Sequence, residues 1–239
     1  MTEKISFITL TNNGYKHYTI NCLETLKKFN LNKKLKVYCM DSNAYEEISE
    51  KHTECIKMED RENLNKMLTY MEEGWNKLTY NKFDIIHKEL LENEYVCFTD
   101  GDIVYQNQEF LNYCLEHIKD CELLIQRDDL GYNQNIDIGN GKIIVPTVCS
   151  GFMFIKRTET TLKLFNRKNI NPNFADDQEY MNSVINKFRH KKLPLSLFPN
   201  GLFYKLFRDK INPYMIHFNY TETAQDKKSL MKKYKKWYL

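Results

Sequence analysis

The sequence has no run that approaches the roughly 20 consecutive apolar residues of a membrane-spanning helix. Residues 1–5 also lack the apolar core of a secretory signal. The seven cysteines are odd in number and scattered, so they do not form a disulfide framework, and no Cys-x-x-Cys pair suggests a structural zinc site. These absences predict a soluble, cytoplasmic protein whose thiols stay reduced.

The chain also has no large excess of positive or of negative charge. The chain has 35 basic and 32 acidic residues, a formal charge of +3. Basic residues dominate the surface of a general nucleic-acid-binding protein, so this balance argues against that class. Residues 227–239 are locally basic, with six lysines among apolar and aromatic residues. We expect a solvated terminal helix there; the alternatives are a flexible lid over anionic phosphates and an anchor on acidic lipid.

The chain lacks an internal repeat, a low-complexity tract and a proline-rich linker. Nothing therefore divides its 239 residues, whose number suits one large α/β domain. Hydrophobic residues make up 42% of the sequence, which supplies a core and excludes extensive disorder. We expect a single domain over residues 1–239.

Apolar runs of strand length alternate with stretches of helical periodicity, which predicts an α/β fold with a mixed, mostly parallel sheet flanked by helices. The expected strands are residues 5–10, 35–40, 95–99, 121–126, 149–155, 193–198 and 214–218. The first expected helix follows residue 14. Three more are expected at residues 82–92, 108–118 and 158–165, and another begins at residues 176–178. Residues 46–73 predict surface helices, and residues 131–141 predict a loop or hairpin.

The most informative segment is the apolar run at residues 95–99, which ends in Asp100, Gly101 and Asp102. Open α/β sheets bind their ligands at the carboxyl ends of strands, where these acids are expected. Two converging carboxylates repel each other unless a cation lies between them. A hard divalent ion that holds a phosphorylated ligand therefore suits the site. The competing interpretation is a solvated acidic turn.

Four short motifs follow one another along the chain: Asp100-Gly101-Asp102, Ser150-Gly151, Asp177-Gln178 and His217. Their order resembles that of the nucleotide-diphospho-sugar transferases, and more narrowly of the GT-A glycosyltransferases, including the small capsid-glycosylating enzymes of large algal viruses. The resemblance spans residues 5 to about 220. It implies a Rossmann-like domain in which residues 1–105 bind the nucleotide, residues 106–220 bind the donor sugar and acceptor, and residues 221–239 form a basic tail.

The resemblance implies a role for each matching residue. Asp100, Asp102 and His217 match the metal site, and the nitrogen of His217 favours Mn²⁺ over Mg²⁺. Positions that match nucleotide or donor contacts are Thr9, Thr11, Asn12, Tyr15, Lys82, Asp100, Gly101, Ser150 and Gly151. In an inverting reaction a carboxylate takes the acceptor proton, for which we expect Asp177, with Asp176 second. In a retaining reaction Gln178 steadies the developing charge.

Several of these residues also have a structural interpretation. A histidine in an apolar strand, such as His217, is more often packed and hydrogen-bonded than a ligand. Lys82 is also compatible with a solvated lysine, and Ser150-Gly151 with a small-residue turn that lets strands pack closely. Asp177 is equally compatible with a helix cap.

The expected function is metal-dependent transfer of a sugar from a nucleotide diphosphate donor, a UDP-sugar by preference, to a hydroxyl of a glycan or glycoprotein. The alternatives are a metal-dependent phosphoesterase or nucleotidyltransferase and a non-catalytic nucleotide-sugar-binding module. A two-metal hydrolase requires more clustered acids and histidines than this chain offers. Nucleic-acid binding through the lysine-rich tail would weaken steeply with salt.

Overall fold

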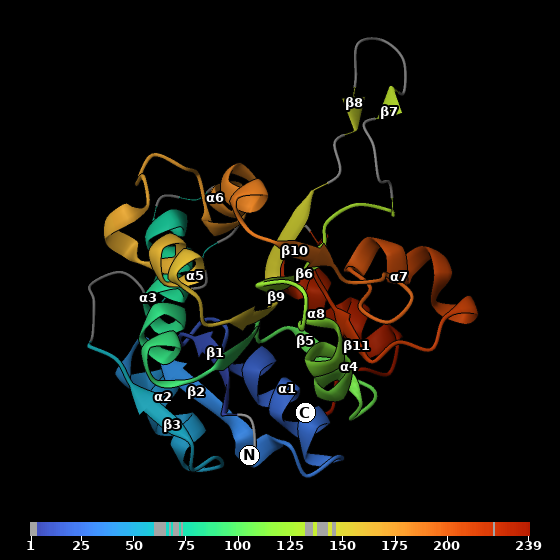
Figure 1. Ribbon diagram of the computed structural model, residues 1–239. Coiled ribbons are helices and arrows are strands. Elements are labelled where there is room, and N and C mark those ends of the chain that lie inside the picture. The colour runs from blue at the N-terminus through green and yellow to red at the C-terminus, as the bar shows by residue number, and fades with distance from the viewer. Residues whose placement is uncertain are drawn as a thin grey trace.

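The computed structural model describes residues 4–59, 66, 68, 72, 74–131, 136–137, 143–144, 147–221 and 223–239. A seven-stranded sheet forms its centre, in the order β10-β6-β9-β4-β1-β2-β3 (Figure 1). Neighbouring strands run parallel except β9, which is antiparallel to both β4 and β6. The strands are β1 (Ile5–Thr11), β2 (Leu35–Cys39), β3 (Cys55–Lys57), β4 (Tyr95–Thr99), β6 (Leu123–Arg127), β9 (Val148–Lys156) and β10 (His190–Lys192).

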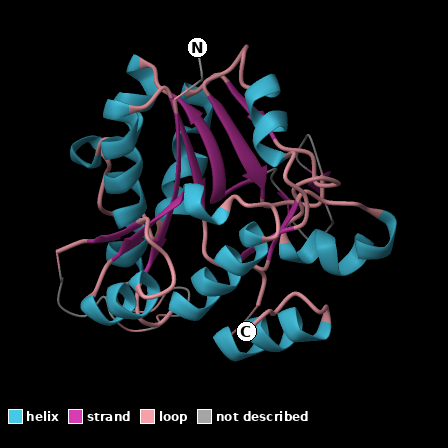
Figure 2. Ribbon diagram, turned by 90° about the horizontal axis from the view of Figure 1, so that it is seen from below, coloured by secondary structure: helices cyan, strands magenta, loops and turns pink. Residues whose placement is uncertain are grey.

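Helices cover both faces of this sheet (Figure 2). Strand residues point alternately to the two faces, so that Phe7 packs in one core cluster and Ile8 in the other. The first cluster includes residues of α1 and α4, and the second includes residues of α3, α5 and α6. The helices are α1 (Lys16–Lys27), α2 (Ser42–Ser49), α3 (Trp75–Glu92), α4 (Phe110–His117), α5 (Glu159–Phe165), α6 (Asp177–Val184), α7 (Gly201–Phe207) and α8 (Ala224–Lys233).

Two short antiparallel pairs lie outside the central sheet. Strand β5 (Ile103–Tyr105) pairs with β11 (Met215–His217), and His217 is opposite Ile103 in the register. This pairing carries His217 next to the acids that precede β5. Strands β7 (Ile136–Asp137) and β8 (Ile143–Ile144) form the second pair.

The expected fold class is confirmed, but two expected segments are wrong. Residues 193–198 are not a strand, because β10 ends at Lys192 and the N–H groups of Leu197 and Phe198 both donate to the Pro194 carbonyl, which makes a turn. Within the described residues, the helical interpretation of residues 46–73 is correct where it overlaps α2 and wrong at residues 55–57, which form the edge strand β3. Residues 60–65, 67, 69–71 and 73 lie outside the described part of the chain, as do most of residues 131–141.

Among the described residues, no helix is both long enough and apolar enough to cross a membrane.

Candidate metal and nucleotide-sugar site

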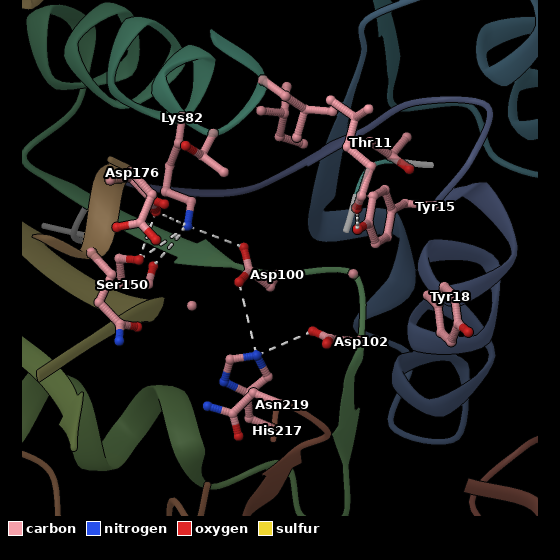
Figure 3. Close-up of a pocket in the computed structure, with 18 of the residues that line it drawn as sticks. Thr11, Tyr15, Tyr18, Lys82, Asp100, Asp102, Ser150, Asp176, His217 and Asn219 are labelled. Atoms are coloured by element: carbon pink, nitrogen blue, oxygen red, sulfur yellow. Dashed lines mark hydrogen bonds and ion pairs between the residues drawn. The ribbon is translucent and has the colours of Figure 1, made fainter. Parts of the chain in front are cut away.

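A cleft of about 530 Å³ lies at the carboxyl ends of β1 and β4. Residues far apart in the chain line it, from Leu10 to Lys227. Figure 3 shows Lys82 pointing from α3 toward Asp100, which lies between Lys82 and His217. The expected strand-edge position of the acid pair is therefore correct, and the cleft brings together most of the residues expected at the site.

Gly101 forms the turn between the two acids at a position where α1 leaves no space for a side chain. A Cβ at position 101 would lie 2.3 Å from Thr19 Oγ1 and 3.2 Å from the Thr19 backbone nitrogen on α1. Thr19 also donates a hydrogen bond of 3.0 Å to Thr11 Oγ1 at the end of β1. Close packing of the turn against α1 thus explains why a residue without a side chain stands between Asp100 and Asp102.

His217 completes a group of three metal-ligand candidates. Its Nε2 lies 3.2 Å from Asp102 Oδ1 and 3.8 Å from Asp100 Oδ2. The ligand atoms of Asp100, Asp102 and His217 all lie within 4.8 Å of one another. Asp102 and His217 are buried, whereas the Asp100 side chain is one-third exposed toward the cleft. These donors converge from the β4–β5 turn and from β11.

Gln126 sets the orientation of the imidazole. Its Oε1 lies 2.8 Å from His217 Nδ1, and its Nε2 donates to the Phe198 and Pro199 carbonyls at 3.2 and 3.0 Å. Because that amide is fixed with its oxygen toward the ring, Nδ1 donates its proton to Gln126 and Nε2 is the nitrogen that faces the acids. An outer partner of this kind fixes the tautomer of a ligating histidine. Burial would lower the pKa of His217, but Asp102 outweighs it and raises that pKa. The sequence analysis placed Gln126 at a strand end without assigning it a role.

An irregularity in β9 builds the wall opposite the acids. The register with β6 jumps between Ile125 and Gln126, so that residues 150–152 of β9 have no partner there. Such bulges often re-aim side chains next to active sites. A Cβ at Gly151 would lie 2.3 Å from His217 Cε1 and 2.8 Å from Asp100 Oδ2, so only glycine fits against the triad.

Lys82 is a buried cation that links the strand-end acids to α6. It pairs with Asp177 and lies 3.3 Å from Asp100 Oδ1. Its ammonium also donates to the Ser150 carbonyl at 3.3 Å, and Ser150 Oγ donates to Asp177 Oδ2 at 2.6 Å. Burial would lower the pKa of Lys82, but Asp100 and Asp177 outweigh it and raise that pKa. Lys82 is thus a charged member of the site and not a solvated surface lysine.

The three expected reaction-centre residues lie at the N-terminus of α6, one as its cap and two in its first turn, and all line the cleft. Asp176 is the helix cap, since its Oδ1 accepts from the Glu179 N–H at 2.7 Å. Asp177 uses Oδ2 for both Lys82 and Ser150, and its Oδ1 makes no hydrogen bond to the residues that the structure describes. Gln178 Nε2 donates to Asp128 Oδ2 at 2.8 Å. The capping role that the sequence left open for Asp177 therefore belongs to its neighbour.

The loop after β1 forms the other end of the cleft. Thr11, Asn12 and Tyr15 line it, and Tyr15 N–H donates to Asn12 Oδ1 at 3.0 Å. Tyr15 OH donates to the Leu68 carbonyl at 2.5 Å, which ties the loop to the segment before α3. Thr9 is not among the lining residues; its hydroxyl is buried and has no hydrogen-bond partner in the described part of the chain.

The lining also contains residues to which the sequence analysis gave no role at the site, among them the polar or charged Asp128, Asn219 and Lys227. Asp128 follows β6 and accepts from Gln178 and from Asn219 Nδ2, the latter at 3.3 Å. Burial raises its pKa. An acid just beyond a strand is the same signal that revealed Asp100, so Asp128 could have been found by extending the rule to β6. Lys227 had been placed in a solvated helix, yet its ammonium pairs with Asp102.

The electrostatics of the acid pair suit a cation. Burial raises the pKa of Asp100, even though Lys82 and His217 oppose this. Burial would also raise the pKa of Asp102, but Lys227 and His217 outweigh it and lower that pKa strongly. Two carboxylates and an imidazole nitrogen that converge beside a glycine form a donor set for a divalent cation, and the mixed oxygen and nitrogen donors suit Mn²⁺ as well as Mg²⁺.

Comparison with known proteins relates this chain to transferases that use nucleotide sugars. The family model of the nucleotide-diphospho-sugar transferases matches residues 30–231. A UDP-galactose:fucoside alpha-3-galactosyltransferase of Dictyostelium discoideum is 24% identical over an alignment of 298 positions, which covers 99% of this chain and 43% of that protein. The chain therefore spans less than half the length of this curated relative.

Solved structures resemble this one at low sequence identity. A glycosyltransferase involved in glycosylation of the major capsid of PBCV-1 has a TM-score of 0.58 at 11% identity, over 96% of this chain and 99% of that chain. The galactosyltransferase LgtC, in complex with donor and acceptor sugar analogues, has a TM-score of 0.56 at 12% identity, over 95% and 94%. Because such identities show the fold alone, the family follows from the model match: this chain belongs to the nucleotide-diphospho-sugar transferase family and has the GT-A glycosyltransferase fold.

Proposed function

We propose that this chain is a metal-dependent glycosyltransferase that moves a sugar from a nucleotide diphosphate donor to a hydroxyl of a glycan or glycoprotein. The observation that carries the proposal is the convergence of Asp100, Asp102 and His217 at one cleft, with ligand atoms within 4.8 Å of one another. A divalent cation held there would neutralise the diphosphate as it leaves the sugar. We take the whole chain, residues 1–239, as one catalytic domain.

The nucleoside would lie in the half of the cleft formed by residues 1–105. Thr11 and Asn12 offer polar groups at the end of β1, and the Tyr15 ring, fixed through its hydroxyl, offers an apolar face. An aromatic face can stack on a base. Thr9 has no part in this pocket, because its side chain lies in the packed interior.

The donor sugar and acceptor would lie in the half formed by residues 106–220. Ser150, Gly151 and Asp128 surround the space between the acid pair and α6. Asp128 is held by two amide donors, which leaves a fixed acceptor for sugar hydroxyls. Burial disfavours the charged form of Asp128 and raises its pKa. Hydrogen bonds donated by the hydroxyls of a bound sugar would stabilise that charged form.

Asp177 and Gln178 face the reacting carbon in this proposal. In an inverting transfer, the acceptor oxygen bonds to the anomeric carbon, the sugar–phosphate bond breaks, and Asp177 Oδ1 takes the acceptor proton. Its other oxygen stays bound to Lys82 and Ser150, which holds the carboxylate in a fixed position. In a retaining transfer, the Gln178 amide oxygen steadies the positive charge at that carbon. The anomeric form of the product distinguishes the two routes.

The Dictyostelium relative supplies the first donor to test, since its name specifies UDP-galactose as donor and a fucoside as acceptor. We expect the purified protein to hydrolyse a UDP-sugar slowly in the presence of Mn²⁺, releasing UDP and free sugar. Hydrolysis should stop with a chelator and return with added Mn²⁺. Product analysis across a panel of UDP- and GDP-sugars, beginning with UDP-galactose, measures this.

Two results would contradict the proposal. The first is equal hydrolysis of a generic phosphate ester, which would indicate a phosphoesterase. The second is binding of UDP-sugars, detected as a rise in thermal midpoint, without turnover of any donor in the panel, with or without glycan acceptors, which would indicate a binding module.

A further inference from the structure

The two oxygens of Asp102 face two different positive or potentially positive groups. Oδ1 lies 3.2 Å from His217 Nε2, on the side of the candidate metal site. Oδ2 pairs with the ammonium of Lys227. A carboxylate that would ligate a divalent cation through one oxygen is thus already neutralised through the other.

Helix α8 holds this lysine firmly in the cleft. Tyr18 OH donates to the Ala224 carbonyl at 2.5 Å, and Met231 is fully buried. Thr223 caps the helix by accepting from the Asp226 N–H at 3.1 Å. The Lys227 side chain is only 17% exposed, which is low for a lysine on a surface helix. The contact between α8 and the acid pair is therefore built into the fold.

The charges in direct contact can be counted. The count takes the His217 imidazole as neutral, the form in which it would ligate a cation. Three acids, Asp100, Asp102 and Asp177, then contribute three negative charges. Lys82 and Lys227 contribute two positive charges, which gives −1. A divalent cation alone would change this to +1. A cation together with the two negative charges of a sugar-linked diphosphate would return it to −1. Without Lys227 the cluster would carry −2, which a divalent cation neutralises with no need of an anion.

We propose that Lys227 makes cation binding and diphosphate binding depend on each other. Its ammonium opposes a divalent cation that arrives without a diphosphate, because like charges at short range repel in a partly buried site. The same charge attracts the diphosphate once the cation is present. The inference rests on the proposed function. It adds that the metal and the donor bind together, because each favours the binding of the other.

The test compares Lys227→Met with the matched control Lys228→Met. Lys228 is the next residue on α8, and its ammonium lies over the Trp237 ring at 4.9 Å, away from the cleft lining. Both changes remove one positive charge from the same helix. Binding of Mn²⁺ alone is followed by electron paramagnetic resonance, and binding of UDP at saturating Mn²⁺ by titration calorimetry.

The expected effects have opposite signs. Lys227→Met should bind Mn²⁺ alone roughly tenfold tighter than the unaltered chain and should bind UDP with Mn²⁺ roughly tenfold more weakly, as expected for one short-range charge. Lys228→Met should change both within about twofold, since exposed charges at a distance are screened. Lys227→Arg should keep both affinities close to those of the unaltered chain.

Three outcomes would overturn the inference, and one of them also addresses the proposed function. Weaker binding of Mn²⁺ alone by Lys227→Met would mean that the lysine orients Asp102 without opposing the cation. Equal changes in both lysine variants would mean a general charge effect. If the unaltered chain binds no Mn²⁺ with or without UDP, the metal-dependent function itself fails. If Lys227→Met does not fold, titration of Lys227→Gln gives the same comparison.

Discussion

Asp102→Asn should lower kcat/KM for sugar transfer by roughly 10²–10³-fold or more, the usual loss when a central electrostatic contact of a reaction is removed. Asparagine has nearly the same shape, so the amide can still accept from Lys227. It carries no negative charge, however, and is a far weaker ligand for a hard divalent cation than a carboxylate. Initial rates at several Mn²⁺ concentrations measure the loss, which added Mn²⁺ should only partly restore.

Asp129→Asn is the matched control for this change. Asp129 is a buried acid next to the cleft that pairs with Arg127 Nε at 2.8 Å, and it is not among the cleft-lining residues. Its replacement should reduce stability but leave kcat/KM within a few fold. Similar rates for Asp102→Asn and the unaltered chain would contradict the metal site proposed here.

Lys82→Met should reduce both stability and activity. Methionine fills much of the same volume, but the change leaves Asp177 buried without its cation and deprives Asp100 of a contact at 3.3 Å. Removing one partner of a buried ion pair costs about 3–5 kcal/mol of unfolding free energy. Urea unfolding measures this loss. Saturating Mn²⁺ with UDP should recover part of it, because the cation replaces some of the missing charge near Asp100.

Lys36→Met separates the loss of a partly buried ion pair from the loss of a site residue. Lys36 Nζ lies 2.7 Å from Glu89 Oε1, in a pair that joins β2 to α3 and does not line the cleft. Its replacement should also destabilise the fold, yet kcat/KM should stay within a few fold. If Lys82→Met retained full activity at a temperature where it is folded, Lys82 would have only a structural role.

The acid pair could be predicted because its signal is local. Residues 95–99 form an apolar strand that ends in Asp100, and every residue needed to place this turn at the sheet edge lies within a few positions. Ser150 and Gly151 could also be predicted from a local signal, the small residues next to an apolar run, but the structure places them inside β9 and not in a turn before it. The jump in register that aims them at the cleft depends on the partner strand β6.

Contacts between residues far apart in the sequence could not be predicted from such local signals. Lys227 is one of six lysines in the tail, and only the packing of α8 against Tyr18 distinguishes it by bringing it to Asp102. Gln126 likewise acquires its role from His217, which reaches it through the pairing of β11 with β5. The error at residues 193–198 has a local cause, since Pro194 interrupts a run whose alternation otherwise favours a strand.

The most direct test of the account is an anomalous-scattering map from a crystal grown with Mn²⁺ and UDP. We expect one strong peak bound by Asp100, Asp102 and His217 Nε2, with the diphosphate oxygens completing its coordination and Lys227 close to a phosphate. A map in which manganese is absent from these three side chains, while UDP is bound elsewhere in the cleft, would contradict the metal-dependent mechanism.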